Sequence, residues 1–239
     1  MSKAVVVLDP GHGGYQPGAV AHGLKEKDLN LDLALKVADR LEGVRVLLTR
    51  ERDIYVSLAD RVALSRRAEA DLFLSLHANA GGGRGFESFV CSNLKAGHRT
   101  IEMQKSLHRQ VMKALKSWNI IDRGLKQAAF YVLRHNPAPA ILIESLFIDN
   151  EREAGLWQEE HFVNTLAGGV VRGVQSALGL ETAGSKDGVN NVPQAVKKEY
   201  KSLYTVQVGA FAYIENARQR LQEAREAGFS DAYIYHKQF

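Results

Sequence analysis

One apolar run near the N-terminus constrains the fold of this chain more than any other feature. Residues 4–8 read Ala-Val-Val-Val-Leu, without the alternation of a half-exposed strand, and this predicts a strand buried on both faces of a parallel sheet. Asp9, Pro10 and Gly11 then interrupt the run, because proline lacks an N–H group and glycine permits unusual backbone angles. His12 is therefore expected at the C-terminal edge of a core strand, where open α/β sheets build ligand sites.

Strand and helix patterns alternate along the next 70 residues. Helical spacing of apolar residues begins near Glu26 and ends before Gly43, and a second helix begins at Ser57, which opens a capping-box-like Ser-Leu-Ala-Asp sequence. Short apolar runs at 44–48 and 72–76 predict the second and third strands. This order predicts an α/β fold with right-handed crossovers on a mostly parallel sheet.

The second half of the chain is expected to complete the same layer. The predicted elements are an added strand at 86–90, a helix at 98–116, a turn at 123–125, a short strand at 130–133, a last buried strand at 140–143 and a closing helix at 162–178. Residues 1–180 are thus predicted to form one domain. Residues 181–199 contain Gly, Ser and Asn without apolar periodicity and are predicted to be a linker. Residues 200–239 have a small β-α-β pattern.

Composition and charge limit the possible settings of the protein. The net charge of +4 and the pI of about 9.1 suit an anionic partner such as a cell wall, a membrane surface or nucleic acid. Cys91 is the only cysteine, which excludes an intrachain disulfide framework. No apolar stretch is long enough for a membrane span or resembles a signal peptide, so we expect synthesis in the cytoplasm and action elsewhere only after release.

Four side chains are expected to meet at one rim of the sheet. His12, His77 and Glu144 each end a predicted buried strand, and Glu26 begins the helix that follows the first strand. Two imidazoles and two carboxylates suit a catalytic zinc site, in which three protein groups bind the metal and the fourth is free as a general base. Histidine and glutamate at strand ends are also common without a metal, so the pattern alone leaves a structural role open.

Several sequence blocks occur together in one order. They are Asp-Pro-Gly-His-Gly-Gly at 9–14, Lys-Glu-Lys-Asp-Leu-Asn-Leu at 25–31, Leu-Thr-Arg at 48–50, Ser-Leu-His-Ala-Asn-Ala at 75–80 and Ile-Glu-Ser-Leu-Phe-Ile-Asp-Asn at 143–150. Over residues 3–179 the chain resembles the zinc-dependent N-acetylmuramoyl-L-alanine amidases of the Amidase_3 type. The resemblance implies a twisted mixed sheet flanked by helices, with His12, Glu26 and His77 binding one zinc ion and Glu144 as the catalytic carboxylate.

The implied reaction is hydrolysis of the amide between N-acetylmuramic acid and L-alanine in peptidoglycan. One departure from the family pattern follows the expected catalytic residue, where Ser145 and Leu146 replace the glycine that more often precedes the phenylalanine. That departure puts only the local loop shape in doubt. Such an enzyme is an autolysin or a phage endolysin, it is expected to be a monomer, and it reaches the wall after mother-cell lysis or through a holin.

The C-terminal fragment has a resemblance of its own. Tyr-Thr-Val-Gln-Val-Gly-Ala-Phe at 204–211, with Asn216 and Ala217 after it, resembles a SPOR peptidoglycan-binding domain. Complete domains of this kind are longer, so residues 200–239 are expected to form only part of one. Aromatic residues of the fragment (Phe211, Tyr213, Tyr233 and Tyr235) would contact glycan or form its core. A SPOR-like region favours a Gram-positive, spore-forming setting.

Other functions fit the sequence less well. A zinc peptidase that acts on stem peptides usually has its first histidine and glutamate three residues apart, whereas His12 and Glu26 are separated by fourteen positions. A non-catalytic wall-binding protein would not need all four polar residues. Nucleic-acid binding is suggested only by the pI, and the chain lacks the aromatic and arginine signatures of such proteins.

A few further residues are weaker candidates. Asn79 and Arg50 would orient ligands or substrate, or serve only in capping and surface pairing. Glu87 would accept a hydrogen bond from a ligating histidine. The remaining histidines are expected to be solvated or capping residues: His22, His98, His108, His135, His161 and His236.

Overall fold

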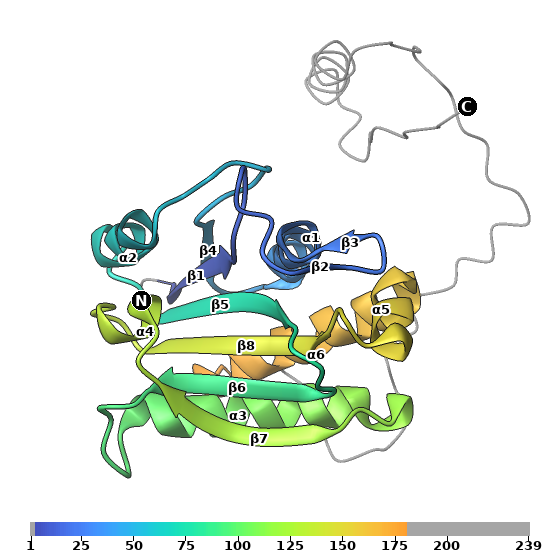
Figure 1. Ribbon diagram of the computed structural model, residues 1–239. Coiled ribbons are helices and arrows are strands. Elements are labelled where there is room, and N and C mark those ends of the chain that lie inside the picture. The colour runs from blue at the N-terminus through green and yellow to red at the C-terminus, as the bar shows by residue number, and fades with distance from the viewer. Residues whose placement is uncertain (1–2, 181–239) are drawn as a thin grey trace, which may run out of the picture. The chain divides into compact units, whose positions relative to one another are not determined.

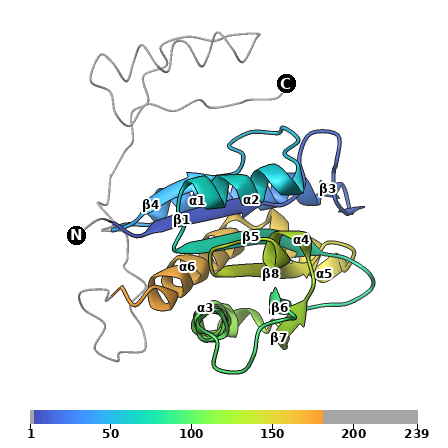
Figure 2. The same cartoon turned by 90° about the vertical axis from the view of Figure 1, so that its left-hand side faces the viewer.

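A computed structural model describes residues 3–180 of the chain. Six strands form one sheet in the order β4-β1-β5-β8-β6-β7, which Figures 1 and 2 show from β4 at the top to β7 at the bottom. The strands are β1 (Val5–Pro10), β4 (Arg45–Leu48), β5 (Leu72–Asn79), β6 (Phe86–Cys91), β7 (Asp122–Ala128) and β8 (Ala140–Phe147). A separate two-stranded hairpin consists of β2 (Val20–Ala21) and β3 (Leu24–Lys25).

The sheet is mixed, as the family resemblance implied. β1 pairs in parallel with β4 and β5, and β5 pairs in parallel with β8. β6 is antiparallel to β8, while β7 is parallel to β6. Consequently the C-terminal ends of β1, β5 and β8 meet at one rim, and the N-terminal end of β6 joins them there.

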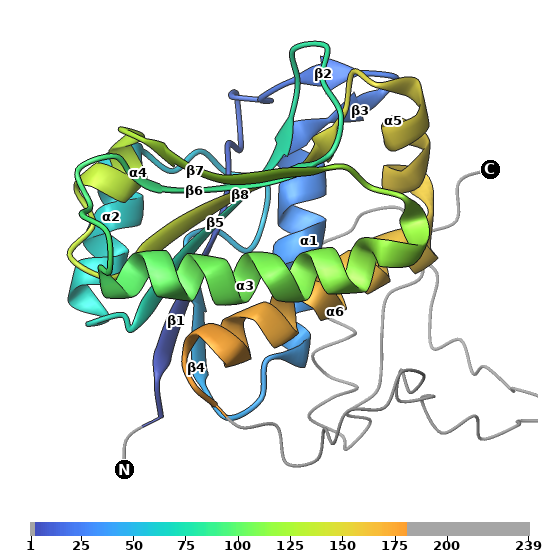
Figure 3. The ribbon, with the colours of Figure 1, turned by 90° about the horizontal axis from the view of Figure 1, so that it is seen from below.

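Helices cover both faces of the sheet, so the central strands are buried on both sides. The helices are α1 (Glu26–Arg40), α2 (Leu58–Arg67), α3 (Arg99–Leu115), α4 (Tyr131–Arg134), α5 (Glu151–Gln158) and α6 (Glu160–Ala177), with a 3₁₀ turn at Lys116–Trp118. On one face, alternate strand residues such as Val6 and Leu8 join the large core beneath α1, α3 and α6 (Figure 3). On the other face, Val7 and Phe73 join a smaller core with residues of α2 and α4.

Several predicted elements are confirmed and four are corrected. The two N-terminal crossovers, the added strand and the long third and closing helices are present. Residues 123–125 are part of β7 rather than a turn, and residues 130–133 contribute to helix α4 rather than a strand. β7 is an edge strand with mostly exposed side chains, so it lacks the apolar run that identifies buried strands. β5 and β8 also continue past His77 and Glu144 instead of ending there.

The predicted linker and the predicted C-terminal fragment lie outside the described residues. Within residues 3–180, no helix is both long and apolar enough to cross a membrane.

Candidate metal centre

Three side chains that could hold a metal ion meet at the rim of the sheet. His12 follows β1, Glu26 is the first residue of α1, and His77 lies in β5. The Nε2 atom of His12 lies 3.1 Å from Oε2 of Glu26, and Nδ1 of His77 lies 2.8 Å from Oε1 of the same carboxylate. One ligand atom from each residue falls within 4.8 Å of the other two. Neighbouring ligands of a tetrahedral zinc ion are about 3.4 Å apart, so this donor set fits zinc in kind and in spacing.

Two glycines make room for these side chains. A Cβ atom on Gly11 would lie 2.2 Å from the imidazole ring of His77. A Cβ atom on Gly18 would lie 2.4 Å from Oε2 of Glu26, and Gly18 also has a φ of +68°. His12 itself has a φ of 60°, a left-handed conformation that is uncommon for residues other than glycine. The backbone around the cluster therefore leaves space for these three side chains.

The carboxylate of Glu26 is held in its charged form. Burial raises its pKa, but hydrogen bonds with His12 and His77 outweigh burial and lower the pKa of Glu26 well below its usual range. The backbone N–H of Ala19 and the side-chain amide of Asn30 also donate to this carboxylate, at 2.9 Å and 3.3 Å. Burial lowers the pKa of His77, but the hydrogen bond to Glu26 and the nearby charge of Glu144 outweigh burial, so that the pKa of His77 is raised overall.

Glu144 lies beside His77, because these two residues are register partners in the β5–β8 ladder. Its Oε2 atom is buried and has no hydrogen-bond partner among residues 3–180. Burial, strengthened by the charges of Glu26 and Glu87 and opposed by His77, raises the pKa of Glu144 to about 7. The carboxyl group can therefore both accept and release a proton near neutral pH.

An irregularity in the ladder follows immediately after Glu144. His77 pairs with Glu144, but Asn79 pairs with Phe147, so β8 contains one extra residue over this interval. Within it Leu146 has a φ of 67° and a fully buried side chain. This bulge occupies the segment where the sequence departs from the family pattern, and bulges of this kind redirect neighbouring side chains.

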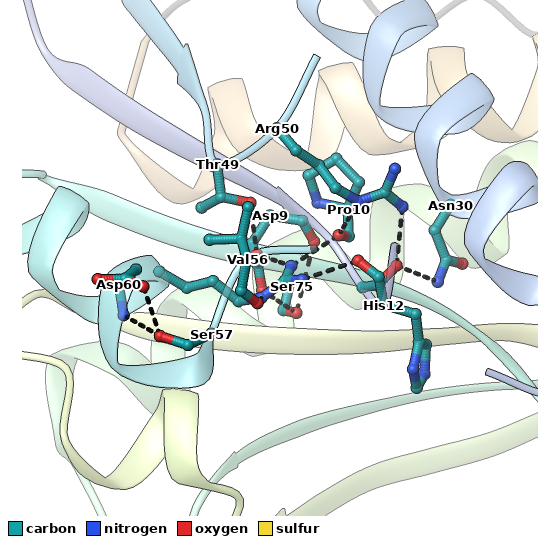
Figure 4. Close-up of polar contacts among 12 residues, drawn as sticks. Asp9, Pro10, His12, Asn30, Thr49, Arg50, Val56, Ser57, Asp60 and Ser75 are labelled. Atoms are coloured by element: carbon teal, nitrogen blue, oxygen red, sulfur yellow. Dashed lines mark hydrogen bonds and ion pairs between the residues drawn. The ribbon is translucent and has the colours of Figure 1, made fainter. Parts of the chain in front are cut away.

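Two buried arginines, Arg50 and Arg61, hold the loop that carries His12, and Figure 4 shows Arg50 beside Pro10 of this loop. Arg50 donates to the carbonyl oxygens of Pro10 and Gly11, at 3.0 Å and 2.9 Å. Arg61 donates to the carboxylate of Asp9 at 2.6 Å and to the carbonyl oxygen of His12 at 2.7 Å. Arg50 was a weak candidate from the sequence, and its side chain contacts the loop backbone rather than the surface.

Asp9 and Arg61 were not predicted as functional residues. Their side chains are 2% and 3% exposed, and Asp9 accepts further hydrogen bonds from Thr49 at 2.6 Å and Ser75 at 2.7 Å. The sequence did contain one indication of this pair: Arg61 is a charged residue next to Val62, on the face by which α2 packs on the sheet. A charge in that position must find a buried partner.

Glu87 does not hydrogen-bond to either histidine, contrary to the expectation from the sequence. It accepts hydrogen bonds from Asn79 at 2.8 Å, from Arg123 at 2.7 Å and from Lys126. Asn79 thus orients Glu87 instead of a metal ligand.

His108 is also not a solvated residue. It is buried, and its two ring nitrogens lie 2.8 Å from Ser88 Oγ and 2.8 Å from Asp122 Oδ1. This Ser-His-Asp row has the residue types of a hydrolase triad, but Ser88 is fully buried and its hydroxyl also accepts from Gln104. Without access for a substrate, the row is a structural network between β6 and α3. His98, in contrast, caps α3 as expected.

Comparison with known proteins agrees with this geometry. Residues 6–176 match the family model described as N-acetylmuramoyl-L-alanine amidase, and residues 182–238 match the SPOR domain model. The sporulation-specific N-acetylmuramoyl-L-alanine amidase of Bacillus subtilis is 38% identical over 228 residues, which cover 94% of this chain and 82% of that protein. The endolysin of Bacillus phage SPP1 is 44% identical over 185 residues, covering 76% of this chain and 68% of that protein.

Solved structures give the same result. An N-acetylmuramoyl-L-alanine amidase from Clostridium difficile 630 aligns with a TM-score of 0.70 and 33% identity, covering 77% of this chain and 100% of that chain. The catalytic domain of an amidase from Bacillus (Paenibacillus) polymyxa aligns with a TM-score of 0.69 and 31% identity, covering 74% of this chain and 99% of that chain. With a family model matched over more than two thirds of its length, this chain belongs to the N-acetylmuramoyl-L-alanine amidase family.

Proposed function

We propose that the chain hydrolyses the amide bond between N-acetylmuramic acid and L-alanine in peptidoglycan, with one zinc ion per chain. The observation that carries this proposal is the unpartnered, buried Glu144 oxygen next to a cluster of three metal-binding side chains. A base beside a metal cluster is the arrangement that metal-assisted hydrolysis requires. Family membership and the amidase names of the relatives support the choice of bond.

The proposed metal ligands are His12, Glu26 and His77. Zinc held by this set would supply a Lewis acid that acidifies a water ligand and polarises the scissile carbonyl. Arg50 and Arg61 hold the backbone of the His12 loop, and Asn30 with the Ala19 N–H holds the Glu26 carboxylate. These contacts keep the donor atoms in place before the substrate arrives, which lowers the cost of assembling the site.

Glu144 is the proposed general base and acid. It takes a proton from the attacking water as the new carbon–oxygen bond forms. It then delivers a proton to the nitrogen of L-alanine as the carbon–nitrogen bond breaks, so that the products are a lactyl carboxylic acid and a free amine. A pKa raised to about 7 suits both proton transfers near neutral pH.

The remaining parts of the proposal concern the setting. Residues 1–180 would be the catalytic domain, residues 181–199 a linker and residues 200–239 a partial SPOR-like domain that retains the enzyme on peptidoglycan. The SPOR match supports the wall-binding role, and it spans residues 182–238, which include the predicted linker. The enzyme would act on the wall as a monomer, after mother-cell lysis or passage through a holin. Relatives of both kinds, a sporulation amidase and a phage endolysin, support this choice of settings.

The test measures new N-terminal L-alanine released from purified peptidoglycan. It compares the wild-type chain, Glu144→Gln, a chelator-treated sample, and Glu102→Gln as a matched control on the exposed face of α3. We expect release by the wild type and by Glu102→Gln, no release by Glu144→Gln, and recovery of the chelated sample when zinc is added.

Other outcomes would favour the competing functions. New amino groups on residues other than alanine would indicate a peptidase that acts on stem peptides. Binding to peptidoglycan without any release would indicate a non-catalytic wall-binding protein.

A further inference from the structure

A charged cluster lies next to Glu144, and its members neither bind the metal nor carry a proton in the proposed hydrolysis. Glu87 in β6 is the register partner of Glu144 across the antiparallel β6–β8 ladder, so both side chains project from the same face of the sheet. Arg123 and Lys126 of β7 donate to the Glu87 carboxylate from the neighbouring strand. Side chains on neighbouring strands therefore form a row that runs from the candidate metal centre toward the β7 edge of the sheet: His77, Glu144 and Glu87. The β7 edge is drawn at the bottom of Figure 1.

This cluster has an excess of positive charge. Glu87 is only 4% exposed, and although burial raises its pKa, hydrogen bonds from Lys126 and Arg123 outweigh burial and keep it charged. One carboxylate thus faces two cations. The two cations are more accessible than their partner, with side chains 32% and 37% exposed.

The guanidinium of Arg123 is held in a fixed orientation with donors to spare. Its Nε donates to Glu87, its Nη1 donates weakly to the Arg84 carbonyl at 3.4 Å, and its Cζ atom lies over the Phe147 ring, 4.8 Å from the ring centroid. Among residues 3–180, no group accepts a hydrogen bond from its Nη2. A preorganised guanidinium with free N–H groups is a suitable partner for a carboxylate.

We propose that Arg123 and Lys126 bind the free α-carboxylate of the second stem-peptide residue, so that the enzyme prefers stems in which this group is not amidated. The proposal rests on the proposed amidase activity and assigns a charge preference to the same site. In peptidoglycan the second residue is a D-glutamate linked through its γ-carboxyl, which leaves its α-carboxylate free unless it is amidated.

The reach of the peptide agrees with the position of the cluster. Two residues of extended chain span about 7 Å beyond the scissile amide. From Glu144 to β7 there are two strand spacings, about 10 Å in total, and both cationic side chains reach back toward Glu87. The α-carboxylate can therefore meet these cations while the amide lies against Glu144.

The opposite flank of the metal centre has a different chemistry. There the loops after β1 and β4 carry the stacked rings of Tyr15 and Tyr55, which are 74% and 41% exposed and 4.5 Å apart. Lys27 on that side is already bound to Asp53 and to the Gly14 carbonyl. An exposed aromatic pair suits a sugar better than a carboxylate, so charge assigns the peptide to the β7 flank and the glycan to the other.

The experiment compares two synthetic muramoyl tripeptides that differ only at the second residue, with a carboxylate in one and a carboxamide in the other. We expect the wild type to have a kcat/KM at least about tenfold higher for the carboxylate form, mainly through KM. Arg123→Gln and Lys126→Gln should reduce this ratio toward one by losing activity on the carboxylate form only. Arg123→Lys should retain part of the preference, and Arg109→Gln, an exposed change on α3 at the opposite face, should leave it intact.

Binding measurements keep the test independent of turnover. In the inactive Glu144→Gln background, the dissociation constants of both tripeptides should show the same preference, and Arg123→Gln should abolish it. Equal kcat/KM values of the wild type for the two tripeptides would overturn the proposal, and so would an equal loss on both forms in the Arg123 and Lys126 variants. If the wild type cleaves neither tripeptide nor intact peptidoglycan, the proposed function itself has failed.

Discussion

Replacing Arg61 by methionine should lower the free energy of unfolding by about 3–5 kcal/mol. Arg61 and Asp9 form an ion pair at 2.6 Å whose side chains are 3% and 2% exposed, so the change leaves a buried carboxylate without its cation. Methionine keeps much of the apolar volume of the arginine stem, which separates the loss of charge pairing from a packing defect. Urea denaturation of the metal-free protein measures this loss directly.

The same substitution should also weaken zinc binding. Arg61 donates to the carbonyl oxygen of His12 at 2.7 Å, and His12 has an uncommon backbone conformation with a φ of 60°. Without that contact the imidazole is no longer fixed beside Glu26, and changes to groups that orient a ligand cost about 10–100-fold in metal affinity. Competition with a fluorescent zinc chelator, in the absence of urea, measures the zinc affinity of the folded variant.

A double mutant tests the cause of both effects. Asp9→Asn alone should also destabilise the fold, because Arg61 then has no buried counter-charge, although Thr49 and Ser75 still contact residue 9. With both substitutions no charge remains buried, so the combined loss should be about 1–3 kcal/mol smaller than the sum of the single losses. Strictly additive losses would refute the ion-pair argument, and an unchanged zinc affinity in Arg61→Met would refute its link to His12.

Three further predictions follow from the site. Glu144→Gln should lower kcat about 10²–10⁴-fold with little change in zinc affinity, because the role proposed for Glu144 is to carry protons and not to bind the metal; a similar loss in zinc affinity would contradict this assignment. A general base must be ionised, so kcat/KM should rise with pH through the pKa of Glu144, which is about 7 without metal and lower beside a bound cation. A profile of kcat/KM from pH 4 to 9 tests this prediction. A kcat/KM that falls as the pH rises over the acidic range would contradict it. Gly18→Ala should weaken zinc binding at least about tenfold, since its Cβ would lie 2.4 Å from Glu26 Oε2, whereas Gly23→Ala, which meets no neighbouring atom, is a control for the positive φ alone.

Much of the core sheet was predictable because its strands are buried on both faces. An unbroken apolar run has few alternatives, and the polar residues after such runs identified His12, His77 and Glu144 as neighbours before any coordinates. The antiparallel direction of β6 could not be predicted, since direction depends on where the connection returns and not on the residues of the strand. The exposed edge strand β7 was missed for lack of an apolar pattern, and with it the significance of Arg123.

The groups that support the centre were harder to predict than the ligands. Asp9 and Arg61 are 52 positions apart, and no local pattern indicates that two such charges pair in the interior. Leu146 illustrates a different limit. The sequence showed that it stands near a position where relatives more often have glycine, but only the structure shows the left-handed φ of 67° together with a fully buried side chain. Burial of the leucine offsets the backbone strain, since a buried leucine contributes about 1.5–3 kcal/mol.

The distribution of the site over β1, α1, β5 and β8 also has a consequence for the newly synthesised chain. His12 and Glu26 leave the ribosome first, but the third donor arrives with β5, about 50 residues later. Glu144 follows on β8, which pairs with two strands that are synthesised earlier, β5 and β6. A nascent chain thus contains all three proposed metal ligands well before it contains the proposed proton carrier. Translation products that stop before Glu144 consequently lack the proposed proton carrier, and we expect them not to cleave peptidoglycan.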